Sequence, residues 1–462
     1  MAKTIVFVMA GGRGSRLSPL TIHRAKPAVP FGGRYRIIDF VLSNFVNSGY
    51  RQIYVLTQFM ASSLIRHLQR NWQLSSIDGF IEIAPAQMRL GDHWYRGTAD
   101  SVAQNLNLIF DARADVVAVF GGDHVYKFDI SQMEAEHRES DADLTIAALP
   151  VPLDEARAFG VIQIDGTGRI TGFQEKPDNP TPMPGRPDHA LVSMGNYLFR
   201  TEALREALLH DEPDATSSHD FGKDVIPRLL KNGALLRVYD FGTNRIPGEP
   251  EQSVPYWRDV GDLDSYIAAN MDVRSRVPSL NLYNRNWRIR TAQRDYPPAR
   301  FVQEPMTPAS TILDSLICEG CVISSARVDT TMLGYDCFVH TGAAVSESVI
   351  LSGCNVGAGA KLHRVMLDKN CSIAPGAEVG LDPEKDAERF PFITPNGFVA
   401  LPKGTVVPKE GPIELANDIA YLLERDAVVG PTFKEWRERL AIGDRRRHSF
   451  TSAGPRYRKY KR

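Results

Sequence analysis

The residues best suited to chemistry lie in a glycine-rich stretch at positions 10–21 (AGGRGSRLSPLT) and at a lysine shortly after it. Three glycines stand within four positions: Gly11, Gly12 and Gly14. Glycine lets the backbone approach an anion closely and turn its N–H groups towards it. Three cations accompany these glycines: Arg13, Arg16 and Lys26. The combination predicts a loop that binds a polyphosphate, although a glycine-rich turn can also be an ordinary strand-to-helix connection.

Two well-known phosphate motifs do not describe this loop. The pattern GxxxxGK[ST] occurs nowhere in the chain, because no glycine, lysine and hydroxyl residue follow one another at that spacing. The dinucleotide pattern GxGxxG fails because its third position falls on Leu17. The loop therefore belongs to a phosphate-binding motif other than these two.

Two aspartates are well placed to hold a metal ion. Asp123 ends the apolar run at 115–122 (DVVAVFGG), and Asp259 ends the stretch at 256–258 (YWR). Hard carboxylates at the end of a strand can hold Mg²⁺ against phosphate oxygens. A strand-end aspartate such as Asp123 can instead be the cap of a helix. Together the two carboxylates predict one metal site.

The segments around these residues predict a parallel sheet that positions them. Apolar, β-branched runs at 3–9 and 52–57 flank a helical pattern at 36–49, which makes a βαβ unit. A parallel sheet binds its ligand at the carboxyl ends of its strands. Another strand is expected at 143–151, and a hairpin near 165–168. The glycine-rich loop and Asp123 should therefore meet at one edge of the sheet.

From residue 311 the sequence changes to short β-branched steps that recur about every six residues, for example at 321–323, 337–339 and 371–373. This spacing is typical of hexapeptide repeats and predicts a parallel β-helix, whose coils stack and tend to associate. We expect a first domain at 1–273, a linker at 274–305, a hexapeptide-repeat β-helix at 306–410, and a helical extension with a basic tail at 411–462.

Composition places the chain among soluble globular proteins. Of its 462 residues, 43% are hydrophobic and 24% are charged, and no apolar run approaches the length of a membrane span. No signal peptide is expected, and five scattered cysteines without a CxxC pattern favour a reducing, cytoplasmic location. Residues 445–462 hold eight Lys or Arg and no acid, which suits a solvated tail or an anionic partner. The main body gives no sign of nucleic-acid binding.

The wording GGRGSRLSPLT followed by RAKP resembles the sugar-nucleotide pyrophosphorylases, and over residues 1–405 the ADP-glucose pyrophosphorylases in particular. The resemblance implies an α/β fold with a Rossmann-like nucleotidyltransferase domain on a mostly parallel mixed sheet, followed by a left-handed parallel β-helix. It implies a reaction of ATP with α-D-glucose 1-phosphate that gives ADP-glucose and pyrophosphate for glycogen or α-glucan synthesis. Mg²⁺ as cofactor, a homotetramer and small-molecule allosteric effectors are further implications.

The same resemblance assigns roles to individual residues. The loop N–H groups and Arg13 would bind the β- and γ-phosphates, Lys26 the developing pyrophosphate charge, and Lys176 the sugar phosphate. Catalytic roles would fall to Arg13, Lys26 and Asp123, and metal binding to Asp123 and Asp259. Further substrate contacts are implied at Gly11, Gly12, Gly14, Arg16, Gln87, Tyr95, Gly97, Gly160, Glu175, Ser193 and Asp220.

Effector binding is expected at the cations Arg24, Arg36 and Lys409. In relatives activated by fructose 1,6-bisphosphate, a lysine precedes the equivalent of Lys26 by three residues and a histidine follows it by four. This sequence has His23 and Pro30 there. We therefore expect fructose 1,6-bisphosphate to be a poor activator.

Several alternatives remain open from the sequence. One is a pyrophosphorylase for UTP or dTTP, a second is a bifunctional enzyme that also transfers an acyl group, and a third is a non-catalytic regulatory subunit. A serine-histidine-aspartate relay within 217–220 (SSHD) is not expected, because the side chains of adjacent residues diverge. That stretch instead predicts a loop and a helix start.

Overall fold

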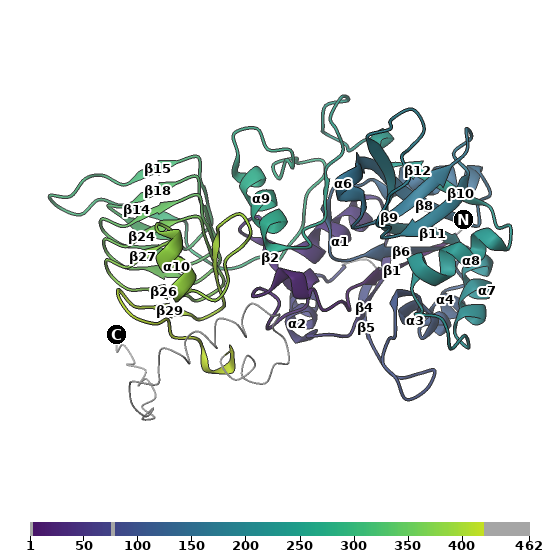
Figure 1. Cartoon of the computed structure of the whole chain (residues 1–462), viewed down its shortest axis with the longest axis horizontal. Coiled ribbons are helices and arrows are strands. Elements are labelled where there is room, and N and C mark those ends of the chain that lie inside the picture. Colours follow the sequence, from purple (N-terminus) through teal and green to yellow (C-terminus); the bar gives the residue numbers. More distant parts are fainter. Residues whose placement is uncertain (1–2, 75–78, 420–462) are drawn as a thin grey trace.

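The computed structural model describes residues 3–74 and 79–419, which form an α/β part and a prism of stacked coils (Figure 1). Most of the predicted helical extension and all of its basic tail, from residue 420 on, lie outside the described residues. None of the described helices is long and apolar enough to cross a membrane.

A nine-stranded sheet forms the centre of the α/β part, in the order β10-β9-β11-β6-β1-β4-β5, with β8 paired to β11 and β12 paired to β8. Four strands run parallel: β1 (Thr4–Met9), β4 (Gln52–Thr57), β5 (Phe80–Pro85) and β6 (Val116–Gly121). The antiparallel pairs involve β8 (Leu144–Pro152), β9 (Gly160–Ile164), β10 (Ile170–Glu175) and β11 (His189–Arg200), while β12 (Leu236–Asp240) is parallel to β8. The sheet is therefore mixed, and the half that contains β6, β1, β4 and β5 is parallel.

Helices cover both faces of this sheet, as the apolar β1 run requires. Val6 and Val8 face one core, while Ile5 and Phe7 face the other, because side chains alternate along a strand. The first core is covered by α1 (Ile37–Asn47), α2 (Ser62–Asn71) and α5 (Ile130–Glu139). The second is covered by α3 (Thr98–Ala103), α4 (Leu106–Ala112), α7 (Thr201–Asp211) and α8 (Ile226–Lys231).

Short elements around the carboxyl edge complete this part. They comprise the 3₁₀ turns η1 (Ser15–Leu17), η2 (Lys26–Ala28) and η4 (Phe241–Thr243), the π-helical turn η3 (Phe221–Val225), and α6 (Leu153–Ala156). Two small ribbons pair β2 (Pro30–Phe31) with β3 (Tyr35–Arg36), and β7 (Val125–Tyr126) with β13 (Trp257–Arg258). Helix α9 (Leu263–Arg274) then leads towards the prism.

The prism is a left-handed β-helix with three parallel sheets, which confirms the hexapeptide-repeat prediction. The first contains β14 (Arg300–Val302), β17 (Val322–Ser324), β20 (Phe338–Val339), β23 (Asn355–Val356), β26 (Ser372–Ile373) and β29 (Val406–Val407). The second contains β15 (Thr311–Leu313), β18 (Arg327–Asp329), β21 (Ala344–Ser346), β24 (Lys361–His363) and β27 (Glu378–Val379). The third contains β16 (Leu316–Ile317), β19 (Met332–Leu333), β22 (Val349–Ile350), β25 (Val365–Leu367) and β28 (Val399–Leu401), and α10 (Pro383–Arg389) lies against the coils. Strand β14 falls in the segment expected to be a linker.

The two parts contact each other through the segments on either side of Lys26. Leu17, Val29 and Phe31 share one apolar core with α9 and with Met332, Val349 and Met366 of the prism. Beside this core, the Arg24 guanidinium makes two hydrogen bonds of 2.9 Å to the Asp368 carboxylate, and both side chains are buried. A bidentate pair of this kind fixes orientation as well as distance. The prism therefore holds the chain two residues before Lys26.

Candidate active site

The glycine-rich loop follows β1 at the carboxyl edge of the sheet and folds over Lys26. Gly14 has a φ of +63°, and a Cβ there would lie 2.8 Å from the Cβ of Lys26. The Gly14 carbonyl also accepts a 3.0 Å hydrogen bond from the Thr21 hydroxyl. Glycine is needed at this position for both its backbone conformation and the close approach of Lys26.

The ammonium group of Lys26 lies between two carboxylates. Its Nζ is 3.1 Å from Oδ2 of Asp123 and 3.0 Å from Oδ1 of Asp259, and the residue is 6% exposed. Asp123 follows β6, whereas Asp259 follows β13, and the β7–β13 ribbon aligns Val125 with Arg258. This antiparallel pairing brings together two aspartates that are far apart in the sequence.

Asp123 and Lys26 hold each other in the ionised state. Burial alone would raise the pKa of Asp123, but Lys26 and then His124 hold it well below its usual range. Burial alone would lower the pKa of Lys26, but Asp123 and Asp259 together raise it. His124 Nε2 lies 3.7 Å from Asp123 and 3.8 Å from Asp259. Asp123 and Lys26 are therefore both charged at neutral pH.

The two carboxylates can hold a metal only with help from another molecule. Among the described residues, no group of three or more His, Cys, Asp or Glu side chains is arranged to hold a metal ion. Asp123 and Asp259 nevertheless point oxygens at a single cationic position, now taken by Lys26 Nζ. Mg²⁺ is often bound by one or two carboxylates together with substrate phosphates. The pair fits a metal that arrives with a phosphate.

A pocket of about 370 Å³ opens beside this cluster. The sequence-predicted residues that line it are Gly11, Gly12, Gly14, Lys26, Tyr95, Gly97, Asp123 and Asp220. Two lining residues that the sequence analysis missed are Gln58 and Thr98. Gln58 comes directly after β4, so its place at a strand end was a usable signal.

Tyr95 is held in the pocket wall by its backbone and its hydroxyl. Gln58 accepts a 2.7 Å hydrogen bond from the Tyr95 N–H and donates one of 3.2 Å to its carbonyl. The hydroxyl accepts from Asn105 at 2.9 Å and donates to the Ala84 carbonyl at 3.4 Å. Burial raises the pKa of Tyr95, so the phenol stays neutral. The wall is pre-formed in the protein.

A second group of predicted residues gathers around Gly222, next to Asp220. The Asp220 carboxylate accepts hydrogen bonds from the N–H groups of Gly222 and Lys223, at 2.9 and 3.1 Å. A Cβ at Gly222 would overlap the Glu175 carboxylate, which also lies near Gly160 and accepts a 2.7 Å bond from Lys176. Ser193, on β11, accepts from the Gly195 N–H at 3.1 Å. Asp220, Glu175 and Lys176 form a polar wall that adjoins the pocket at Asp220.

Seven predicted contacts are not among the residues that line the pocket: Gly160, Glu175, Lys176 and Ser193, and also Arg13, Arg16 and Gln87, which are exposed. The Arg13 guanidinium lies over the ring of Phe59, 5.2 Å from its centre. The Arg16 guanidinium reaches Gly261, close to Asp259, since a Cβ on Gly261 would lie 3.2 Å from it. Gln87 lies just beyond the end of β5. The two arginines thus place positively charged side chains at the rim of the site.

The predicted effector cations lie apart from this pocket. Arg36 lines a separate cavity of about 460 Å³ with Arg66, Arg70 and Arg294. Lys369 directly follows Asp368, the partner of Arg24, and burial, then Arg24 and Arg36, lower the pKa of Lys369 to about 7. The chain of Lys409 instead packs near Gly376 of the prism. Lys369 was missed because its neighbours come from distant parts of the sequence.

Comparisons with known proteins agree with this geometry. Residues 5–276 match the nucleotidyl transferase family, and residues 297–401 match the GlmU-like C-terminal hexapeptide family. The glucose-1-phosphate adenylyltransferase of Thermus thermophilus is 52% identical over 403 residues, which are 86% of this chain and 97% of that protein. The chain belongs to the glucose-1-phosphate adenylyltransferase family. Members from Anaeromyxobacter sp. and Vibrio parahaemolyticus are each 46% identical, over 87–88% of this chain and 98–100% of their own lengths.

Family membership confirms the resemblance expected from the glycine-rich loop and the RAKP stretch. It also agrees with the two-part fold, since one family model covers the α/β part and the other covers most of the prism. The adenylyltransferase therefore has its Lys26, Asp123 and Asp259 cluster within the nucleotidyl transferase segment.

Replacing Lys26 by methionine tests the charge balance of this cluster. Asp123, with a lowered pKa, contributes stability above its unfolded pKa of about 3.9 and loses it as pH falls through the folded value. Lys26, with a raised pKa, contributes below its unfolded value of about 10.4 and loses it as pH rises through the folded value. We expect Lys26→Met to lower the free energy of unfolding between about pH 4 and pH 10.

Urea unfolding of the wild type and of Lys26→Met from pH 3 to 8 measures the difference in their free energies of unfolding. This difference should become smaller as the pH falls below 4. Lys176→Met is the matched control, because Lys176 pairs with Glu175 but is mostly exposed, so its loss should change stability little at any pH. A difference between wild type and Lys26→Met that stays constant down to pH 3 would contradict the coupling of Lys26 to the aspartates.

Proposed function

We propose that this chain transfers the adenylyl group of ATP to α-D-glucose 1-phosphate, forming ADP-glucose and pyrophosphate for glycogen or α-glucan synthesis. The observation that carries the proposal is the Lys26, Asp123 and Asp259 cluster beside a glycine-rich loop. It stands in a chain that is 52% identical to a protein named for this activity. Attack by the sugar phosphate on the α-phosphorus needs positioning and charge neutralisation, and no covalent intermediate.

On the nucleotide side, the N–H groups of Gly11, Gly12 and Gly14 bind the β- and γ-phosphates, and the rim arginines Arg13 and Arg16 add positive charge. Asp123 and Asp259 hold Mg²⁺, which supplies neutralisation of phosphate charge when bound. Lys26 stabilises the charge that develops on the pyrophosphate. Its place between the two aspartates supports this role, because an ammonium so close to the loop needs little movement to reach a phosphate.

On the sugar side, Lys176 anchors the phosphate of glucose 1-phosphate, and Glu175 and Asp220 accept hydrogen bonds from its hydroxyls. Gly97, Gly160 and Ser193 make further contacts with the sugar phosphate. Tyr95 contacts glucose 1-phosphate, and Gln87 lies beside the base and the sugar. The contact of Glu175 with Gly222, next to Asp220, supports placing these acceptors in one wall.

The prism supports a proposal for the assembly and the location of the protein. We propose a homotetramer, because Phe301, Met306 and Leu313 in the first coils are exposed apolar side chains that stacking of a second copy would cover. All five cysteines are free and buried, which suits a reducing, cytoplasmic environment. No nucleic-acid or membrane partner is needed for this function.

Pyrophosphate release tests the reaction directly. The purified chain with Mg²⁺ is assayed with ATP, UTP, GTP or dTTP against glucose 1-phosphate, mannose 1-phosphate or N-acetylglucosamine 1-phosphate. We expect activity with ATP and glucose 1-phosphate only, and a loss of about 10²- to 10³-fold in Lys26→Met because a charge stabiliser is removed. A preference for another nucleotide would contradict ADP-glucose as the product. No pyrophosphate release with any of these pairs would favour a non-catalytic regulatory subunit.

We further propose that the cavity lined by Arg36, Arg66, Arg70 and Arg294 binds an anionic effector, with Lys369 and Arg24 beside it. So many cations around one cavity, with the Asp368 carboxylate already paired to Arg24, leave an excess of positive charge for an anion to neutralise. Lys409 remains a candidate on the prism, away from the contacts described for Arg24 and Arg36.

Effector titrations test this cavity. Fructose 1,6-bisphosphate, fructose 6-phosphate, pyruvate, AMP and orthophosphate are added to the assay, and the saturable response to the best of them should disappear in Arg294→Ala. Fructose 1,6-bisphosphate should activate poorly, because His23 and Pro30 stand where the relatives activated by it have a lysine and a histidine. Lys409→Ala serves as the comparison. A strong, saturable activation by fructose 1,6-bisphosphate, or a response unchanged in Arg294→Ala, would contradict the proposal.

A further inference from the structure

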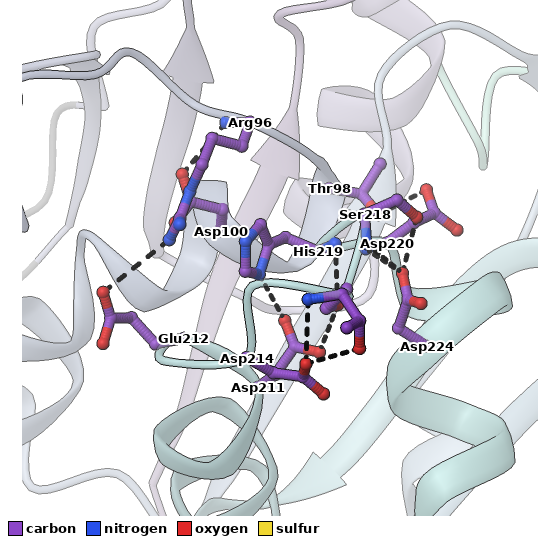
Figure 2. Close-up of polar contacts among 12 residues, drawn as sticks. Arg96, Thr98, Asp100, Asp211, Glu212, Asp214, Ser218, His219, Asp220 and Asp224 are labelled. Carbon is purple, nitrogen blue, oxygen red and sulfur yellow. Dashed lines mark hydrogen bonds and ion pairs between the residues drawn. The ribbon is translucent and has the colours of Figure 1, made fainter.

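A buried pair of side chains lies behind the pocket wall, where the sequence analysis expected only a loop and a helix start. His219 Nδ1 is 2.9 Å from Oδ2 of Asp211, and the two residues are 4% and 2% exposed. Because a carboxylate only accepts, His219 Nδ1 carries the proton of this bond. Figure 2 shows the pair at the centre of a polar network between two loops. The same carboxylate accepts a 2.7 Å bond from the Ser217 hydroxyl, which in turn accepts from the His219 N–H.

This arrangement fixes the backbone of His219 in an uncommon conformation. Its φ is +57°, in the left-handed region, where histidine is tolerated better than most side chains but is still uncommon. In this conformation the carbonyl of His219 accepts hydrogen bonds from the N–H groups of Ala99 (2.8 Å) and Asp100 (3.4 Å) at the start of α3. A Cβ at Gly97 would overlap the same carbonyl oxygen. The His219 backbone is thus a contact surface for the loop that carries Tyr95 and Gly97.

Asp220, the residue after His219, connects the His219 backbone to the pocket. The Thr98 hydroxyl donates a 3.0 Å hydrogen bond to Oδ2 of Asp220 and accepts one of 3.0 Å from the Phe221 N–H. Thr98 and Asp220 both line the pocket. The second oxygen of Asp220 caps η3, so only Oδ2 has spare capacity to accept from a ligand hydroxyl.

The anchor for both loops is the end of α7. Asp211 is the last residue of this helix, whose Leu204 and Leu208 are fully buried in the core beneath the sheet. The next residue, Glu212, lies 3.7 Å from Arg96, which also binds Asp100 at 2.8 Å (Figure 2). A packed helix end therefore holds the 95–100 loop through Glu212 and the 217–221 loop through Asp211.

We propose that Asp211 and His219 are positioning residues for the hexose phosphate, acting through Asp220 and Thr98. The inference rests on the proposed function, since it assigns the Asp220 wall to the sugar. The pair holds the His219 backbone, this backbone holds the start of α3, and both place the Oδ2 acceptor of Asp220 towards the substrate hydroxyls. The His219 ring is buried and is not among the described side chains that line the pocket, which excludes direct proton transfer to the substrate.

Three variants and one control test the pair in the full-length chain. His219→Ala removes the ring N–H, and Asp211→Asn keeps the volume but replaces one of two acceptor oxygens with a donor. His219→Asn is the conservative rescue, because asparagine also tolerates the left-handed region and its amide N–H stands where histidine has Nδ1. The control is Asp214→Asn, on the same loop, whose carboxylate binds Arg228 and Thr216 and has no described bond to α3 or Asp220.

Michaelis constants for glucose 1-phosphate and for ATP are measured separately, with thermal unfolding of each variant. Displacement of a binding group by about 1 Å can cost about 10²-fold, so we expect His219→Ala and Asp211→Asn to raise the constant for glucose 1-phosphate by at least about tenfold. The constant for ATP should change less than about twofold, since the glycine-rich loop is a separate element. His219→Asn should recover most of the loss, and Asp214→Asn should behave as wild type.

Equal effects on both substrates, no effect on either, or an Asp214→Asn variant as impaired as Asp211→Asn would overturn the inference, because the pair would then be merely structural or unimportant. If His219→Ala does not fold, Asp211→Asn against Asp214→Asn gives the same comparison. A wild-type chain that forms no ADP-glucose would overturn the proposed function, and this inference with it. An active wild type with unchanged constants in the variants would overturn the inference alone.

Discussion

The site depends on one electrostatic constraint: the carboxylates of Asp123 and Asp259 share a single cation, the ammonium group of Lys26. Asp123 and Asp259 both place an oxygen about one hydrogen-bond length from Lys26 Nζ. Without that cation, two carboxylates at this distance would repel each other and one would tend to take up a proton. Gly14 allows Lys26 to approach, and the β7–β13 ribbon brings Asp259 to Asp123. The loop, the ribbon and the sheet edge all serve this one contact.

The β-helix contributes to the same constraint from the other side. The Arg24 and Asp368 pair and the shared core around Leu17 and Met366 fix the chain just before Lys26 to the prism. The cavity of basic side chains lies near this junction, because α2, which carries Arg66 and Arg70, packs against η2, the turn that begins at Lys26. An anion bound there would change the charge next to the segment that carries Lys26. A physical connection between the two cavities therefore exists in the fold itself.

Local signals in the sequence were sufficient for the elements and for part of the site. The apolar runs before the glycine-rich loop and Asp123 predicted two strands that end at the same edge of one sheet, and the hexapeptide spacing predicted the prism, because both signals are local in the sequence. Gln58, Lys369 and the Asp211 and His219 pair were missed, because each gains its meaning from partners that are remote in the sequence or joined through the backbone. The sequence excluded a relay within SSHD, and the histidine there is indeed paired with an aspartate outside it.

The most direct test of the account is a double-mutant cycle on the two aspartates, with the rate of ADP-glucose synthesis measured at saturating substrates and increasing Mg²⁺. If Asp123 and Asp259 act as one cation site, Asp123→Asn and Asp259→Asn should each lose about 10²- to 10³-fold, and the double variant should be about as slow as either single variant. Losses that multiply in the double variant, or a Mg²⁺ dependence that neither substitution alters, would contradict a shared site.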